Sequence, residues 1–184
     1  MPRMSPVLGT LMSLIATTAF AAGPAHPGAQ PIGHFGVWEA ASFMDNGNKV
    51  CYMATPPSST ASTKPVKNRD KNVLFFITQW PADHEKNAIT ISTGYEYKEG
   101  TKAVVTVNSK DYPLSTGGGT TGAGADMAWM EDDAQEDALV AAIKIGSTLT
   151  VKGTSKRGTV ITDTYSLKGS TEAYAAISKA CDLK

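Results

Sequence analysis

Apolar and polar residues alternate along much of the chain, in short runs separated by turn-forming residues. The clearest run is 88–95, in which Ile89 and Ile91 lie on one face and hydroxyl side chains lie between them. Similar runs cover 49–54, 103–107, 148–152 and 159–167. Because successive side chains of a strand point to opposite faces of its sheet, each run predicts a strand with one buried face.

The run 72–80 differs, because it is apolar on both of its faces. One face carries Val73, Phe75 and Ile77, and the other carries Leu74, Phe76 and Trp80. A strand of this composition is typically central in its sheet and covered on both sides. Many short strands with few helices favour an antiparallel sandwich or barrel, and we predict an all-β-dominated antiparallel β-sandwich.

Two short α-helices are predicted near the C-terminus, at about 133–144 and 171–180. Acidic residues crowd the start of the first helix, where the helix dipole favours negative charge, and Gly146 follows its end as a stop signal. Ser170 is the expected N-cap of the second helix. Helical spacing places Ile177 and Cys181 together on its buried face.

The N-terminus has the features of a cleaved signal peptide, which we assign to residues 1–21. Arg3 precedes an apolar run that is too short for a stable membrane anchor, and the run ends in the cleavage pattern Ala19-Phe20-Ala21. An uncleaved anchor is the alternative. Residues 22–33 contain three prolines and three glycines, so we expect a mature N-terminal segment without regular structure. The folded domain is then 34–184, and no later segment is apolar enough to cross a membrane.

Charge argues against nucleic acid as a partner. Without Arg3 the chain has 16 basic and 17 acidic residues, a formal charge of −1. The basic residues are scattered, apart from Lys156 and Arg157 in a predicted turn. A chain of this kind has no bulk electrostatic attraction for nucleic acid or acidic lipid.

Cys51 and Cys181 are the two cysteines of the chain. Exported proteins pass through an oxidising compartment, where a pair of cysteines usually forms a disulfide bond. We therefore predict the disulfide Cys51–Cys181. The alternative is a catalytic Cys51 with a histidine partner, for which the chain offers His26, His34 and His84.

Other motifs do not reach the pattern of a metal or cofactor site. The glycine-rich segment 117–124 resembles a phosphate loop, but no lysine follows it and the next residues do not predict a helix. We expect a flexible loop between two strands. The acidic residues between 126 and 137 lack the oxygen spacing of a calcium loop, and the three histidines lack the spacing of a zinc site. We expect neither a metal nor a cofactor.

Asp163 is the most informative charged residue, because it shares a predicted strand face with Ile161 and Tyr165. A carboxylate on an apolar face needs partners, which Arg157 or nearby loop N–H groups could supply. It could be a catalytic acid or base, or a structural carboxylate that holds the turn. We favour the structural role, because no second carboxylate or nucleophile pairs with it in the sequence.

Aromatic residues could form a binding platform, although most of them fall on strand positions that should face the core. They are Trp38, Tyr52, Trp80, Tyr95, Tyr97 and Trp129. Trp129, next to the glycine-rich loop, is the one whose placement the pattern leaves open. Because binding residues concentrate on exposed loops, Trp129, Lys156 and Arg157 form the candidate binding surface.

Several short motifs occur in an order that resembles the invasion-associated locus B (IalB-like) family of bacterial envelope proteins. The matching stretches are Phe35-Gly36-x-Trp38, Lys49-Val50-Cys51-Tyr52, Asn68-Arg69-Asp70, Lys98-Glu99-Gly100, Ala128-Trp129, Leu139-Val140-Ala141-Ala142, and the closing stretch from Val151 through Gly169 to Cys181. The glycine-rich segment 117–124 looks like an insertion into this pattern.

The resemblance implies an exported protein of the periplasm, outer envelope or cell surface, and some members of the family are linked to host-cell invasion. No catalytic site or cofactor is established for the family, so none is carried over. We expect a non-enzymatic binding protein with an unknown envelope or host partner. The alternatives are a small periplasmic hydrolase built around Asp163, and a purely structural or stress-related envelope protein.

Overall fold

A computed structural model describes residues 26, 28–66, 69–120, 122 and 124–183. In this part of the chain, strands that all pair antiparallel form a continuous sheet in the order β1-β2-β3-β5-β6-β9-β8-β7-β10-β11-β4. The strands are β1 (Gln30–Phe35), β2 (Trp38–Asp45), β3 (Asn48–Thr55), β4 (Ser59–Ser62), β5 (Leu74–Trp80), β6 (Glu85–Ser92), β7 (Ala103–Val107), β8 (Lys110–Thr116), β9 (Met127–Trp129), β10 (Thr148–Thr154) and β11 (Val160–Ser166). The helices are α1 (Asp133–Ile145), α2 (Ser170–Ala180) and the short 3₁₀ helix η1 (Pro81–Asp83).

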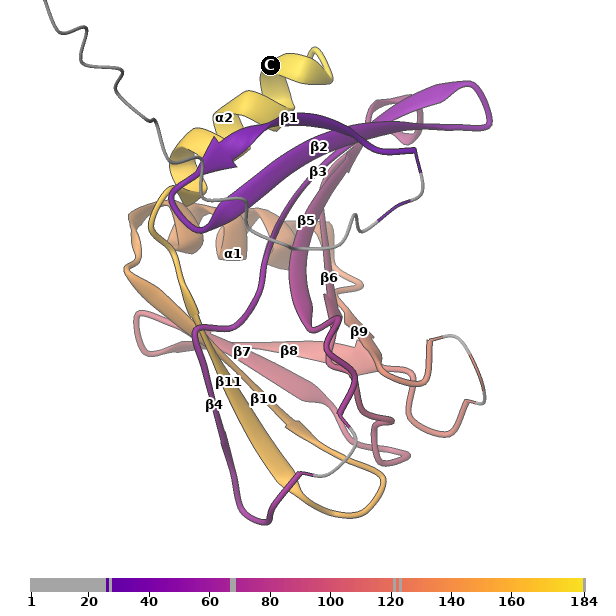
Figure 1. The fold of residues 1–184 in the computed structure, drawn as a ribbon, viewed down its shortest axis with the longest axis vertical. Helices are drawn as coiled ribbons and strands as arrows, with labels where there is room; N and C mark the ends of the chain where they lie inside the picture. The colour runs from indigo at the N-terminus through magenta and orange to yellow at the C-terminus, as the bar shows by residue number, and fades with distance from the viewer. Residues whose placement is uncertain (1–25, 27, 67–68, 121, 123, 184) are drawn as a thin grey trace, which may run out of the picture.

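The sheet folds back on itself, so that its two halves pack face to face (Figure 1). Phe75 on β5 contacts Trp38 on β2, with ring centroids 6.2 Å apart, and Tyr165 on β11, at 5.8 Å. All three side chains are fully buried. The predicted antiparallel β-sandwich-like fold is therefore confirmed, with its core between the two halves.

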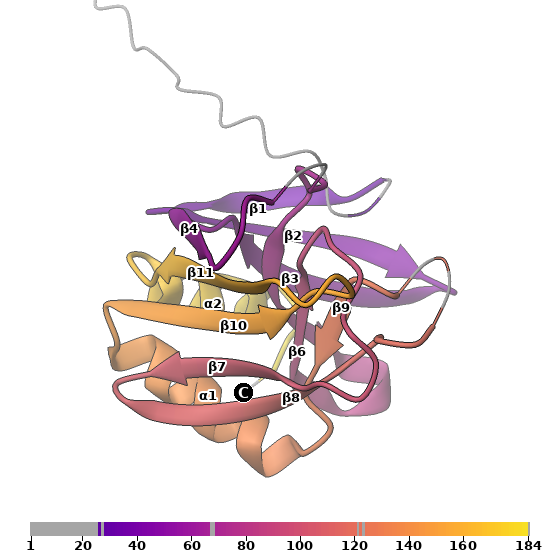
Figure 2. The same cartoon turned by 90° about the horizontal axis from the view of Figure 1, so that it is seen from below.

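The two helices cover the same end of the molecule (Figures 1 and 2). Helix α2 packs on β1, β2 and β3, and α1 packs on β6 and beside α2. Asp132 caps α1 by accepting a hydrogen bond from Gln135 N. The predicted cap of α2 is wrong, because Ser170 is already helical and Gly169 precedes it in the left-handed conformation. The Ser170 hydroxyl instead donates to Ile143 O and joins the two helices.

Strand β1 corrects the expectation that residues 22–33 lack regular structure, because it begins at Gln30. Proline is tolerated here because β1 is an edge strand, where one row of N–H groups has no partner strand. The pairing with β2 also shifts register between Pro31 and Gly33. A β-bulge of this kind absorbs a residue that does not fit the regular ladder.

Strand β5 is central, between β3 and β6, but it is not covered on both sides as predicted. Phe75 and Ile77 are fully buried, whereas Leu74 and Phe76 on the opposite face are only partly buried. Helix α2 and strand β11 both cover the face that carries Phe75 and Ile77. Gln79 on this face donates to Ser178 of α2, and Phe75 contacts Tyr165 of β11. The outer face carries an aromatic row instead, in which Tyr52 contacts Phe43 and Phe76.

Candidate functional site

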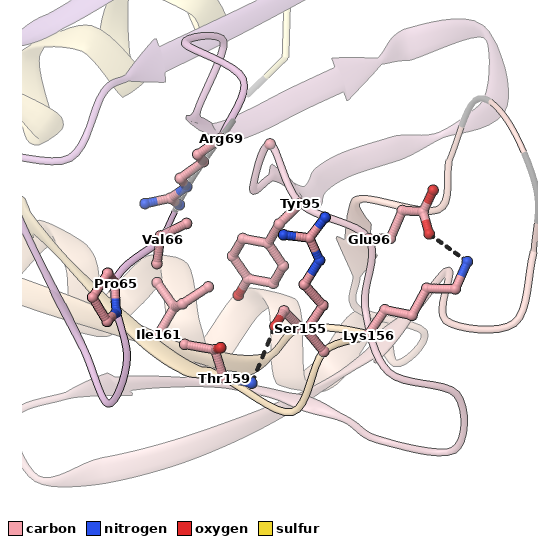
Figure 3. Close-up of a pocket in the computed structure, with 11 residues that line it drawn as sticks. Pro65, Val66, Arg69, Tyr95, Glu96, Ser155, Lys156, Thr159 and Ile161 are labelled. Carbon is pink, nitrogen blue, oxygen red and sulfur yellow. Dashed lines mark hydrogen bonds and ion pairs between the residues drawn. The ribbon is translucent and has the colours of Figure 1, made fainter.

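A pocket of about 630 Å³ lies between three loops that are distant in the sequence (Figure 3). Its lining residues come from the segment before β5, the segment after β6, and the β10–β11 turn with the start of β11. They are Pro65, Val66, Arg69, Gly94, Tyr95, Glu96, Ser155, Lys156, Arg157, Thr159 and Ile161. This volume is within the range of small-molecule sites.

Arg69 forms one wall of the pocket and reaches behind it to Asp163. Its Nη1 donates to Asp163 Oδ1 at 2.8 Å, and its Nη2 donates to Oδ2. Its Nε donates to Thr93 O at 2.7 Å, and Thr60 Oγ1 donates to Asp163 Oδ1 at 2.6 Å. The Asp163 side chain is 1% exposed and the Arg69 side chain 14%, so the carboxylate end of this bidentate pair is buried. The pair joins β4, β11 and the segment that follows β6.

The partner of Asp163 is therefore Arg69 and not the nearby Arg157. Burial works to lower the pKa of Arg69, but the hydrogen bond and charge of Asp163 outweigh it, so the pKa is raised. The alternating pattern identified Asp163 as buried on the face of Ile161 and Tyr165, and the structure confirms this. Arg69 carries no such local pattern. The signal that could have identified it is the Asn68-Arg69-Asp70 stretch among the motifs of the resemblance.

The β10–β11 turn holds two cations at the rim of the pocket. Ser155 N donates to Thr159 O at 2.9 Å, and Gly158 takes a positive φ of 77° to close the turn. Lys156 Nζ lies 2.7 Å from Glu96 Oε2, with both side chains more than half exposed. Arg157 is exposed, and among the described residues its side chain forms no ion pair.

Tyr95 lines the pocket, and Tyr97 packs against it. The Arg69 guanidinium lies 5.4 Å from the Tyr95 ring centroid, and Tyr97 packs edge-on against Tyr95 at 5.2 Å. Gly153 on β10 makes room for both rings, since a Cβ there would lie 2.5 Å from Tyr95 Oη. Burial, followed by the charge of Asp163, raises the pKa of Tyr95 to about 12. Its hydroxyl is therefore a neutral hydrogen-bond donor at physiological pH.

Comparison with known protein families identifies the family of this chain. The sequence profile of the invasion associated locus B (IalB) protein family matches residues 38–178, which include β2, Arg69, the pocket turn and most of α2. The chain belongs to the IalB family. The resemblance seen in the sequence motifs is thereby confirmed.

A solved structure has the same fold as this IalB-family protein. The crystal structure of invasion associated protein B from Bartonella henselae superposes with a TM-score of 0.56 and 16% sequence identity. The superposition covers 82% of this chain and 96% of that chain. Among curated protein sequences, none matches this IalB-family chain significantly.

The remaining predicted site residues of the IalB-family protein lie apart from the pocket. Trp129 on β9 is half-buried and pairs with Thr90 and Ser115, so it does not line the pocket with Lys156 and Arg157. Cys51 is bonded to Cys181, which joins β3 to the end of α2. A bonded sulfur is not a nucleophile, so the bond argues against a catalytic Cys51.

A group of carboxylates lies where α1 meets β6. Ligand oxygens of Glu85, Asp133 and Glu136 lie within 4.8 Å of one another, close enough to share a cation. Glu136 is 4% exposed, and its Oε1 accepts a hydrogen bond from Ile89 N at 2.9 Å. Burial, with some repulsion from Glu85, Asp133 and Asp137, raises the pKa of Glu136 to about 7. The contact to Ile89 shows a role in docking α1 on β6.

The fold and the disulfide bear on where the IalB-family protein resides. Among the helices of the described residues, none has the length and apolarity needed to cross a membrane. The Cys51–Cys181 bond fits an extracytoplasmic compartment, where disulfides persist.

Proposed function

We propose that this IalB-family protein is exported and acts as a non-enzymatic binding protein, with the pocket beside Arg69 as its ligand site. The observation that carries this proposal is Arg157, a guanidinium without an ion-pair partner among the described residues, at the rim of a cavity of about 630 Å³. A concave site with apolar walls and a few converging polar groups is the usual form of a ligand site.

The polar groups that could carry out hydrolysis, Asp163 and Ser155, already form structural hydrogen bonds, which favours binding over hydrolysis. Both carboxylate oxygens of Asp163 accept hydrogen bonds from Arg69, and Asp163 does not line the pocket. Ser155 Oγ accepts a hydrogen bond from Thr159 N at 3.2 Å, which supports a role in shaping the turn. A hydrolase would need a nucleophile paired with a base, and no histidine lines the described pocket.

The site of action that we propose is the cell envelope. A cleaved signal peptide at 1–21 would deliver the mature chain to the periplasm, and from there it could reach the cell surface. The solved relative is named for an association with invasion. We propose an envelope or host partner for this chain, with a role in host-cell invasion or in envelope integrity.

In-cell photo-crosslinking tests this proposal. A photoreactive amino acid replaces Pro65 at the pocket rim, Trp129 on β9, or Lys152 on β10 as an exposed control. We expect a discrete molecule, identified by mass spectrometry, to be captured from Pro65 and not from Lys152. Identical, abundance-weighted capture from both positions would refute the pocket as the binding site. Discrete capture from Trp129 alone would move the site to that surface.

A further inference from the structure

We infer that the pocket recognises a small amphiphilic anion, with a carboxylate or phosphate group held by Arg157 and an apolar body held by Val66, Ile161 and Tyr95. This inference rests on the proposed binding function and adds the chemical class of the ligand. It follows from the distribution of charge and apolar surface around the cavity.

Among the described residues that line the pocket, one cation has no carboxylate partner. The Arg69 charge is matched by Asp163 in a bidentate pair, and the Lys156 charge is matched by Glu96. Arg157 has no carboxylate partner among the described residues. A guanidinium presents paired donors that match the oxygens of a carboxylate or a phosphate. The Arg157 guanidinium therefore suits an anionic group on a ligand.

The Lys156–Glu96 pair can adapt to such a ligand. Its side chains are 70% and 54% exposed, and exposed ion pairs contribute little stability, about 0–1 kcal/mol. Lys156 could therefore turn from Glu96 to a bound anion at small cost. The backbone of the turn stays in place, because Lys156 N donates to Glu96 O at 2.7 Å independently of the side chains.

The opposite side of the cavity carries its apolar residues, beside Thr159 and the Arg69 guanidinium that is paired with Asp163. Figure 3 shows Pro65, Val66 and Ile161 on the side away from the Lys156–Glu96 pair, with the Tyr95 ring between the two sides. Ile161 belongs to the buried core, so this wall is fixed in place. An apolar body placed here would bury surface that the anionic group alone would leave in water.

Binding of short amphiphiles to the mature protein, residues 22–184 with its disulfide intact, tests the inference. The probes are octanoate, octyl phosphate, neutral octanol and inorganic phosphate, titrated by heteronuclear NMR. We expect octanoate or octyl phosphate to shift the NMR resonances of pocket residues saturably. Octanol and inorganic phosphate should each bind with an affinity at least about tenfold lower. The relative affinity of the first two distinguishes a carboxylate ligand from a phosphate one.

Arg157→Gln should weaken binding of the preferred anion about tenfold or more, because it removes a charge-assisted hydrogen bond. Lys152→Gln is the matched control, an exposed cation outside the pocket, and should leave the affinity unchanged. Equal binding of octanol and octanoate, or wild-type affinity in Arg157→Gln, would overturn the anion assignment. Discrete crosslinking from Pro65 would in that case leave the binding function standing with a different ligand, whereas its loss would remove both.

Discussion

Asp163 places a charge among apolar side chains, and its environment explains how the fold tolerates it. Arg69 occupies both of its oxygens, and Thr60 adds a third hydrogen bond. Removing one member of a buried ion pair is costly because the other charge is left without a partner. Arg69 also anchors the loop that carries it, because its Nε donates a hydrogen bond to Thr93 O. One residue pair thus positions the wall of the pocket.

Asp163→Ala should lower the free energy of unfolding by about 3–5 kcal/mol, because it leaves the Arg69 guanidinium uncompensated. Chemical denaturation measures the change directly. Asp83→Ala, at an exposed carboxylate of η1, is the control and should change stability by less than about 0.5 kcal/mol. Unchanged stability in Asp163→Ala would rule out the structural role.

At the scale of elements, the packing of α1 on β6 includes a titrating group. Glu136 of α1 accepts a hydrogen bond from the backbone of Ile89, in the neighbourhood of three other carboxylates. The pKa of Glu136 is raised to about 7, from an ordinary value of 4.5. The folded protein therefore retains a proton that the unfolded chain releases between these pH values. The stabilisation from this proton is complete below pH 4.5 and is lost as the pH rises through 7.

Glu136→Gln should consequently stabilise the protein at pH 8 more than at pH 5, relative to the wild type. Glutamine keeps an acceptor for Ile89 N but carries no charge to repel the adjacent carboxylates. Melting temperatures of both proteins at the two pH values provide the test. Glu172→Gln, at an exposed carboxylate of α2, serves as the control. The same difference in melting temperature at pH 5 and pH 8 would contradict a protonated Glu136 in the folded state.

The strand predictions also show where local pattern stops being informative. Alternation in the run 88–95 continues through Tyr95, yet β6 ends at Ser92. The chain turns away because Gly94 adopts a positive φ of 66° and its carbonyl accepts a hydrogen bond from Asp70 N. Tyr95 therefore lines the pocket instead of continuing a strand. A contact with a residue so far along the chain leaves no periodic signal.

For the molecule as a whole, the disulfide joins the first half of the sandwich to the end of the chain. Cys51 and Cys181 are 130 residues apart, so the bond closes a loop that includes most of the domain. A cross-link of this length restricts the unfolded chain strongly. We expect the bond to be a major contributor to stability in an oxidising compartment.

Reduction of the bond, or the double variant Cys51→Ser with Cys181→Ser, should lower stability by up to about 4–5 kcal/mol on chain-entropy grounds. Intact mass with and without a thiol-blocking reagent reports the state of the cysteines, and we expect no free thiol in the native protein. Thermal unfolding of the oxidised and reduced protein gives the change in stability. Two reactive thiols in the native protein would refute the bond.

Features with a local cause were predictable from the order of amino acids in this chain. Alternation specified β3, β6, β7, β10 and β11, and terminal charges and a stop glycine specified α1. The side-chain period of two specified the burial of Asp163. The partner of Asp163 and the pocket were not predictable in this way. Arg69 is 94 residues from Asp163, and the pocket joins three loops that meet when the sheet folds back on itself. Such contacts arise from packing between distant segments, and the residues near each position along the chain do not encode them.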